Sequence, residues 1–383
     1  MRVIISVFGK FHAFSLAEQL QRKKYLSKLY TTYPKHLIYK KYKISKKNIS
    51  SIILFEIIWR TFRNTLSSKA KLFLNYYLKI IYDYLISFSL NRKTDIFIGW
   101  SSSSLFCLKK SKKLGIITII ERGSTHIIEQ NNILKKEYDK YNLRFPDQIK
   151  FIERELQEYE LADYISIPSI FVKDSFIKNG IPEDKLLLNP YGANLVQFYK
   201  MKKEDNKFRY IFVGNFSIRK GSHYLIKALS EMENLNFEFW HIGGVDKNMY
   251  PFIKKYKSDN MHFLGVKKNN ELAYYYSQSN VFVLPSLEEG LALVIQEAMS
   301  CGLAIICTQN TGASTVIEDE REGFIIPPAN EKILKEKLLW CFNNKKKCTE
   351  MGIQASKKVL ENYKWDDYGN KYHQNLQKII NNF

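Results

Sequence analysis

The sequence lacks the features that mark membrane-spanning and disulfide-stapled proteins. No run reaches about 18 consecutive apolar residues, the usual minimum for a helix that crosses a bilayer. The five cysteines are odd in number and show no CxxC spacing, which argues against a disulfide framework and a zinc site and favours a reducing compartment. The first residues, MRVIISVFG, turn polar too soon for a signal peptide. We therefore expect a globular protein in the cytoplasm.

Acidic residues are scarce in the first hundred positions. There, 19 Lys and Arg stand against four Asp and Glu, which concentrates about +15 of the formal net charge of +21 in a quarter of the chain. Residues 35–50 interleave lysines with Tyr and Ile, and the apolar segments 52–64 and 72–90 follow. This mixture suits an anionic membrane surface, although basic solvated faces over an ordinary helical core would look the same. Nucleic acid is not expected as a partner, because no nucleic-acid-binding module accompanies the patch.

Short apolar strands recur along the chain and alternate with longer segments. At 383 residues the chain is too long for one core, so two domains are expected. Continuous apolar runs with Gly or polar turns are typical of buried parallel strands in βαβ units. They lie at 2–8, 95–100, 116–120 and 164–169, then, after a Lys-rich link at 199–208, at 209–215, 236–244, 261–266, 281–286, 303–308 and 323–328. The pattern predicts an α/β protein with two doubly wound domains that face each other, and ligand-binding loops after the strands.

Two of those loops hold charged residues suited to a phosphate and to hydroxyl groups. Arg219 and Lys220 precede Gly221 just after a strand, where they could neutralise a diphosphate; a solvated turn is the alternative. Glu289 and Glu297 enclose seven residues around the start of a helix, whose free N–H groups suit an anion. The two carboxylates would instead accept hydrogen bonds from hydroxyl groups. They would lie roughly 12 Å apart along the helix, so one could bind a sugar and the other a ribose. This combination points to a nucleotide-sugar. Taken alone, the two acids would more simply be a helix-start acid and an exposed helical residue.

Five motifs then occur in one order that carries a family resemblance. They are SIPSIFVKDSF (166–176), NPYGANLVQF (189–198), FVGNFSIRKG (212–221), FLGVKKNNELAYYYSQSNVFVLPSLEEG (263–290), which leads into the paired glutamates, and GASTVIEDEREGFIIPP (312–328). Together they resemble the nucleotide-binding domain of retaining glycosyltransferases of family 4 (glycosyl transferases group 1). The resemblance implies the GT-B fold, two Rossmann-like domains facing across a cleft. We assign residues 1–200 to an acceptor-binding domain, residues 201–364 to a donor-binding domain and residues 365–383 to a helix that packs back on the first domain.

The resemblance also implies roles for individual residues. Lys220 and Arg219 would hold the donor diphosphate, although many members have an arginine where this chain has Asn215. Glu289 would contact the transferred sugar and Glu297 the ribose hydroxyls. His126 would point at the donor sugar and take part in catalysis, whereas His12 on the first glycine loop is as readily a structural residue. Main-chain contacts with the donor are expected at Gly9, Gly265, Val266, Gly290, Leu291, Ala292, Leu293 and Val294.

The function implied is transfer of a sugar from a nucleotide-sugar to an acceptor hydroxyl with retention of anomeric configuration. Neither a metal nor a cofactor is expected, and the acceptor would be a glycan or a lipid-linked glycan in bacterial cell-surface polysaccharide or glycolipid synthesis. The same fold also serves sugar-nucleotide epimerases and phosphorylases. A basic nucleic-acid- or membrane-binding protein with a catalytically silent fold is a further alternative.

Overall fold

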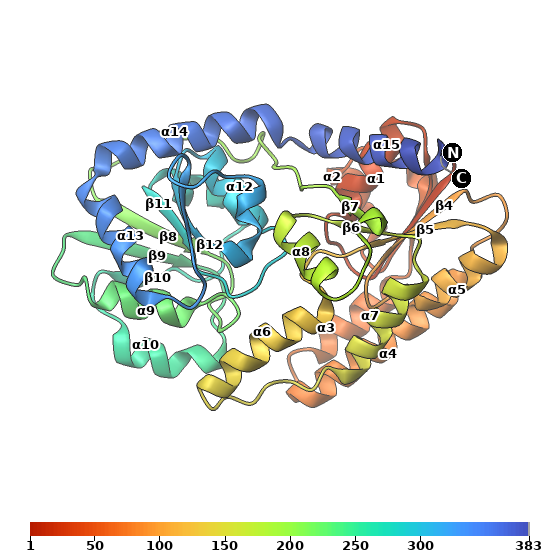
Figure 1. Cartoon of the computed structure of the whole chain (residues 1–383), viewed down its shortest axis with the longest axis horizontal. Coiled ribbons are helices and arrows are strands. Elements are labelled where there is room, and N and C mark those ends of the chain that lie inside the picture. The colour runs from red at the N-terminus through yellow and green to blue at the C-terminus, as the bar shows by residue number, and fades with distance from the viewer. Residues whose placement is uncertain (382–383) are drawn as a thin grey trace.

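The computed structural model describes residues 1–381, which form two parallel β-sheets side by side along the long axis of the molecule (Figure 1). The first sheet has seven strands in the order β3-β2-β1-β4-β5-β6-β7, and all neighbours are parallel. Its strands are β1 (Val3–Val7), β2 (Leu26–Thr31), β3 (Ile49–Ser51), β4 (Ile96–Trp100), β5 (Ile117–Glu121), β6 (Tyr164–Ile167) and β7 (Leu186–Leu188).

The second sheet has six parallel strands in the order β10-β9-β8-β11-β12-β13. Its strands are β8 (Phe208–Val213), β9 (Phe237–Ile242), β10 (Met261–Phe263), β11 (Val281–Leu284), β12 (Ala304–Thr308) and β13 (Gly323–Ile326). In both sheets the chain starts near the middle, runs outward and then crosses to the other side. This order confirms the predicted pair of doubly wound domains.

Of the thirteen strands within residues 1–381, ten were predicted from the sequence. They are all six strands of the second sheet and β1, β4, β5 and β6 of the first. The strands β2, β3 and β7 were not predicted. Strand β2 mixes apolar with polar residues, and β3 and β7 are three-residue strands at the two edges of their sheet. Such short or mixed segments show no clear period, so the sequence pattern did not separate them from loops.

The helices fill the connections between the strands. Those of the first half are α1 (Ala13–Arg22), α2 (Lys35–Lys41), α3 (Ile53–Phe62), α4 (Ser68–Ser87), α5 (Leu105–Leu114), α6 (Ile127–Lys140), α7 (Ile149–Leu161) and α8 (Ile170–Lys178). Those of the second half are α9 (Ser222–Ser230), α10 (Tyr250–Tyr256), α11 (Leu272–Ser277), α12 (Leu293–Ser300), α13 (Glu331–Asn343) and α14 (Lys345–Asn362). Local signals set several of the ends: Ser67 and Asn330 cap the starts of α4 and α13, and left-handed Gly115 ends α5.

The last helix, α15 (Trp365–Asn381), returns to the first half of the molecule (Figure 1). It packs against α1, where Arg22 Nη1 lies 2.6 Å from Asp366 Oδ1 and Gln19 donates to the same carboxylate. The predicted return of the C-terminal helix thus corresponds to the observed packing through residue 381, and residues 382–383 lie outside the described part. The exact domain limits stay predictions.

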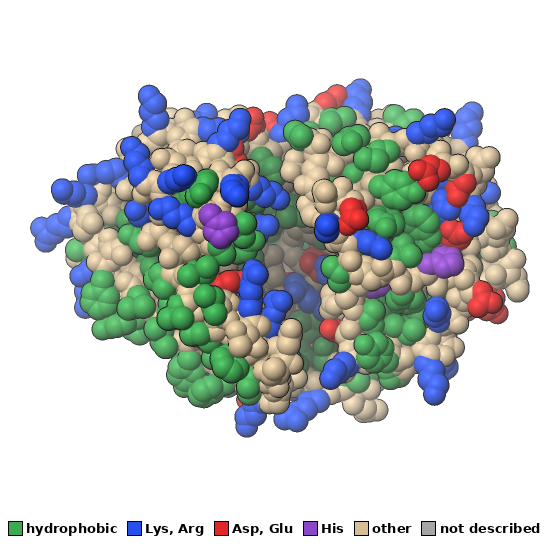
Figure 2. Space-filling model, turned by 180° about the vertical axis from the view of Figure 1, so that it is seen from behind, with side chains coloured by type: hydrophobic (Ala, Val, Ile, Leu, Met, Phe, Trp, Pro, Cys, Tyr) green, Lys and Arg blue, Asp and Glu red, His purple; other side chains and the backbone are tan. Residues whose placement is uncertain are grey.

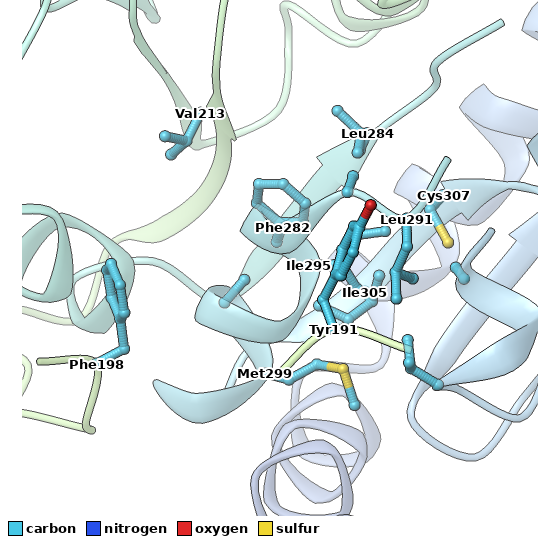
Figure 3. Close-up of a cluster of buried hydrophobic side chains, with 14 of the residues drawn as sticks. Tyr191, Phe198, Val213, Phe282, Leu284, Leu291, Ile295, Met299, Ile305 and Cys307 are labelled. Atoms are coloured by element: carbon cyan, nitrogen blue, oxygen red, sulfur yellow. The ribbon is translucent and has the colours of Figure 1, made fainter. Parts of the chain in front are cut away.

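The second sheet is held on one side by an apolar core that also carries the candidate site. Figure 3 shows the side chains of Leu291, Ile295 and Ile305 gathered between α12 and the strands, with Tyr191 of the first half beside them. All four are buried. Because α12 is fixed by this core, the loop that precedes it is held in place at the carboxyl edge of the sheet.

Candidate active site

The turn after β8 brings two cations to the carboxyl edge of the second sheet. Gly221 has φ of +63°, and a Cβ added there would lie 1.9 Å from the carbonyl oxygen of Pro285, so this turn requires glycine. The Nζ of Lys220 lies 2.6 Å from Glu289 Oε1, and Nη2 of Arg219 lies 2.9 Å from Glu288 Oε2. Two neighbouring cations therefore face two neighbouring carboxylates of the next loop.

The loop between β11 and α12 lies between the two halves of the molecule. Gly290 passes so close to the first half that an added Cβ would lie 1.9 Å from the carbonyl oxygen of Gly123. Helix α12 then begins at Leu293, and the preceding Ala292 offers no side-chain cap to its first N–H groups. Such uncapped N–H groups can bind an anion. The predicted contacts at Gly290, Leu291, Ala292, Leu293 and Val294 thus sit on or beside a helix start.

Glu297 lies about one turn into α12, closer to the helix start than the two turns that the sequence suggested. Its Oε2 accepts a hydrogen bond of 3.3 Å from the hydroxyl of Tyr276. Burial raises the pKa of Glu297 to about 7, and the hydrogen bond from Tyr276 only partly opposes this effect. Near pH 7 the carboxyl group of Glu297 is therefore partly protonated and partly ionised.

Glu297 borders a cavity of about 630 Å³ between the halves. Leu293 lines it from the same helix, and Lys10 and His12 line it from the loop after β1. The remaining wall comes from α1, the end of α2, the connecting segment 192–198, Asn269 and the start of α15. Figure 2 shows the molecule hollowed between its halves, with Lys and Arg side chains inside the hollow. The volume is in the range of small-molecule sites.

His12 is held at this cavity by an acid from the first sheet. Its Nε2 lies 2.9 Å from Oε2 of Glu121, the last residue of β5, and the hydroxyl of Tyr372 donates to Oε1 of the same carboxylate at 2.8 Å. The ring of Tyr191 packs against the imidazole, with 4.4 Å between the centroids. A carboxylate that holds one imidazole nitrogen fixes the ring orientation, as in many catalytic sites. The sequence analysis singled out His12 but did not predict its contact with Glu121.

His126, the predicted catalytic residue, lies in a different environment. Its side chain is buried, its ring packs against Tyr159 and Phe176, and it is not among the residues that line the cavity. Burial, together with nearby Arg122, lowers the pKa of His126 to about 4, so its ring is neutral near pH 7. His126 thus lies outside the cavity lining, as do Arg219, Lys220 and Glu289, and its catalytic role stays a prediction.

The other predicted donor residues lie on loops at the same edges of the two sheets. Gly9, with φ of +100°, follows β1, and its N–H donates to Thr32 Oγ1 at 3.0 Å. Asn215 is exposed after β8. Gly265 follows β10, its carbonyl accepts from the N–H of Gly243 at 3.0 Å, and Val266 beside it is exposed. These positions are compatible with donor contacts, and their roles remain predictions.

Glu288 is a residue of the site that the sequence analysis missed. Its side chain is fully buried, and besides Arg219 it accepts hydrogen bonds from the N–H and hydroxyl of Thr125 and from Gln130 Nε2, all at 2.9–3.0 Å. Burial alone would raise the pKa of Glu288, but Arg219 and these hydrogen bonds outweigh it and hold the pKa below its usual value. Glu288 thus joins the second half to the first. The sequence places two adjacent acids on one loop and two adjacent bases on another, but this pattern does not show which acid is buried.

Metal coordination has no obvious place in this arrangement. Within residues 1–381, no three His, Cys, Asp or Glu side chains are grouped as metal ligands would be. The expected chemistry without metal or cofactor stays a prediction.

Comparison with known proteins agrees with the fold and the edge loops. The family model described as "Glycosyl transferases group 1" matches residues 196–358. The second half of the chain is thus similar to this family. The matched region spans the turn after β8, the loop before α12 and both glutamates of the predicted pair.

Two curated relatives match more of the chain. An uncharacterized glycosyltransferase of Methanocaldococcus jannaschii is 27% identical over 259 residues, 66% of each chain. The N,N'-diacetylbacillosaminyl-diphospho-undecaprenol alpha-1,3-N-acetylgalactosaminyltransferase of Campylobacter jejuni is 25% identical over 253 residues, 61% of this chain. The match spans just under two thirds of the length of each relative, 66% in both cases.

Solved structures extend the likeness to both halves. The Anabaena protein HepE, in complex with UDP-glucose, matches with a TM-score of 0.68 at 15% identity over 99% of this chain and 100% of its own. At that identity the match concerns the fold, and it confirms the GT-B arrangement of two Rossmann-like domains.

Proposed function

We propose that this protein transfers a sugar from a nucleotide-sugar to a hydroxyl of a glycan or lipid-linked acceptor, with retention of configuration as in family 4. The observation that carries the proposal is the meeting of Arg219 and Lys220 with the loop that leads into α12. Cations and free helix N–H groups converge there, as a diphosphate requires. The Campylobacter relative, whose name specifies an undecaprenol-linked acceptor, supports the acceptor class.

In this proposal the donor lies along the loop and α12. Its diphosphate binds Lys220, Arg219 and the N–H groups of Leu293 and Val294, and its ribose hydroxyls donate to Glu297. The sugar contacts Glu289 and the backbone from Gly290 to Ala292, the base contacts the loop of Gly265 and Val266, and Gly9 and Asn215 border the phosphates. Because Lys220 is now paired with Glu289, donor binding exchanges one anionic partner of the lysine for another.

The reaction breaks the bond between the anomeric carbon and the diphosphate oxygen and forms a bond from that carbon to the acceptor oxygen on the same face. The acceptor proton passes to the departing phosphate oxygen. Negative charge grows on the diphosphate as the first bond breaks, so fixed cations near that oxygen stabilise the transition state more than the ground state. Arg219 is preorganised for this role because Glu288 holds its guanidinium.

A thermal-shift panel with UDP, GDP, ADP, CMP and their sugar conjugates tests donor binding. A ligand at about 100 times its dissociation constant adds roughly 2.7 kcal/mol of stability. We expect Lys220→Met to lose the shift and Lys247→Met, at an exposed lysine of the same half, to keep it. Equal shifts in both variants would remove Lys220 from the diphosphate site.

The reaction class is tested by following the donor with and without an acceptor. Release of nucleoside diphosphate that depends on an acceptor hydroxyl is expected. Conversion of the donor without acceptor would indicate an epimerase, and a requirement for inorganic phosphate would indicate a phosphorylase.

The two histidines can be separated by one pair of variants. His126→Phe fills the same apolar surroundings, so it should keep the fold and, on the geometry described, most of the turnover. His12→Asn removes a side chain that lines the cavity and should lower turnover. Loss of turnover in His126→Phe with an unchanged melting temperature would support the predicted catalytic role of His126.

A further inference from the structure

Helix α4 is apolar on two opposite sides. Its inner stripe, which includes Leu78, Tyr82 and Ile86, is buried in the first half of the molecule. A second stripe recurs every three to four residues and points outward, with Phe73 60% exposed and Ile81 48% exposed. A helix that is apolar all round is normally covered on all sides. Within residues 1–381, the outer stripe of α4 therefore stays largely uncovered.

The neighbouring helix α3 extends the same apolar surface. Leu54 and Ile57 are exposed by 60% and 53%, and the two helices pack against each other. Of the 23 exposed large hydrophobic side chains within residues 1–381, ten fall between residues 53 and 88. Figure 2 shows hydrophobic side chains gathered at its lower left, over the part of the molecule where α3 and α4 lie. We call the outward side of residues 53–88 the α3–α4 face.

The charges around the α3–α4 face are positive. Arg60, Arg63 and Lys69 are exposed on it or beside it. The segment contains two acids. One of them, Glu56, is paired with Arg60 at 2.7 Å. The other, Asp83, is buried under α4, where it pairs with Arg154 and accepts from two N–H groups at the start of α5. Because Glu56 balances Arg60, the face presents Arg63 and Lys69 as cations beside its apolar side chains, and neither acid of the segment is free.

We propose that the α3–α4 face docks the protein on an anionic lipid bilayer. Apolar side chains would enter the boundary between headgroups and acyl chains while the flanking cations meet lipid phosphates, as in other amphipathic surfaces. Tyr77 and Tyr84 on the outer stripe suit the interface, since each has an apolar ring and a polar tip. A second copy of the chain fits less well, because it would bring the same positive charges together.

Docking of this kind leaves the protein peripheral. Within residues 1–381 the structure shows no helix with the length and apolarity needed to cross a bilayer. Because Asp83 ties α4 to α5 and α7, the face is rigidly joined to the first sheet and hence to the cleft. The proposal rests on surface composition and does not depend on glycosyl transfer.

Sedimentation of the whole protein with vesicles tests the proposal. We expect binding to vesicles of about 30% phosphatidylglycerol in phosphatidylcholine at low salt, weak binding to pure phosphatidylcholine, and partial release in high salt, because exposed charges are screened there. Each flanking cation should contribute about fivefold to the partition coefficient. The triple variant Leu54→Ser, Ile57→Ser, Phe73→Ser should bind at least tenfold more weakly, with its melting temperature retained because all three side chains are exposed.

The matched control is the double variant Tyr250→Ser, Ile353→Ser, which removes exposed apolar side chains from the second half. It should bind like the wild type. Absence of wild-type binding to anionic vesicles, or equal losses in both variants, would overturn the proposal. A dimer that the triple variant alone disrupts in sedimentation velocity, without vesicle binding by the wild type, would assign the α3–α4 face to self-association.

Discussion

Replacing Glu297 by Gln tests the electrostatics of the candidate site. The carboxyl group of Glu297 has a pKa of about 7 in the folded protein, against 4.5 for an unperturbed glutamate. Between these pH values the folded state keeps a proton that the unfolded state has lost. The stability of the wild type therefore falls as the pH rises from 4.5 to 7. Glutamine cannot ionise, so the stability of the variant does not fall for this reason as the pH rises.

The size of the effect follows from the shift. A rise of about 2.5 in the pKa corresponds to about 3 kcal/mol of unfolding free energy, and above pH 7 the wild type has lost all of this stability. Near pH 5 wild type and variant should have similar stability, and at pH 8 the variant should be more stable by up to that amount. For a domain of this size, about 2–4 °C per kcal/mol gives a difference in melting temperature of about 6–12 °C.

The assay is thermal unfolding of both proteins at pH 5, 6, 7 and 8. The difference at each pH cancels other titrating groups, such as Glu158, whose pKa burial raises to about 8. Glu336→Gln, at an exposed carboxylate of α13, controls for loss of one charge. In Tyr276→Phe the hydrogen bond that lowers the pKa is gone, so the loss should move to higher pH. If the difference in melting temperature between wild type and Glu297→Gln stays constant from pH 5 to 8, burial does not raise the pKa of Glu297 as described.

Donor binding adds a second test of the same residue. A carboxylate accepts hydrogen bonds from two ribose hydroxyls only when ionised, so a bound nucleotide should favour the charged form of Glu297. Stabilisation of the wild type by the nucleotide found in the panel should then grow between pH 6 and pH 8 and stay constant in Glu297→Gln. The same pH dependence in both proteins would exclude the ribose role and leave the pKa argument intact.

Three further outcomes are expected. Gly290→Ala should destabilise the contact between the halves, because the added Cβ would lie 1.9 Å from the carbonyl oxygen of Gly123. Small-angle scattering should then show a larger radius of gyration. An unchanged radius would count against a rigid contact. Glu288→Ala should lower the free energy of unfolding by about 1–3 kcal/mol, since it leaves the buried donors of Thr125 and Gln130 without an acceptor, and an unchanged free energy in chemical denaturation would contradict this. Ellman's reagent should find no reactive thiol before unfolding, because all five cysteines are buried: Cys107, Cys301, Cys307, Cys341 and Cys348.

Sequence reasoning worked best where one local pattern has one structural meaning. The strands β8 to β13 lie in largely apolar runs and most of their residues are buried, so their class and order could be predicted. The position of Arg219 and Lys220 just past β8 followed from the rule that ligand loops come after parallel strands. The partly buried β2 and the short edge strands β3 and β7 carry no such pattern and were missed.

The surroundings of individual side chains were harder to predict from the sequence. The catalytic role of His126 was inferred from the family resemblance, which says nothing of the surroundings of its ring in this chain. The tertiary structure turns its ring toward Tyr159 and Phe176, on two helices more than 30 positions further along the chain. The same holds for Glu288 and Glu289, which are adjacent in sequence. One is buried between the halves and the other faces Lys220, because packing against Thr125 and Gln130 selects between them.

By itself, then, the sequence determined the two doubly wound sheets, the connection between them and the loops that carry charge, since these depend on periodic burial and on local turn chemistry. Only the tertiary structure decided which histidine reaches the cavity, which glutamate joins the halves and which apolar stripe of α4 stays uncovered. Each of these depends on contacts between segments far apart in the chain, and the energy of such contacts is not encoded in any local pattern.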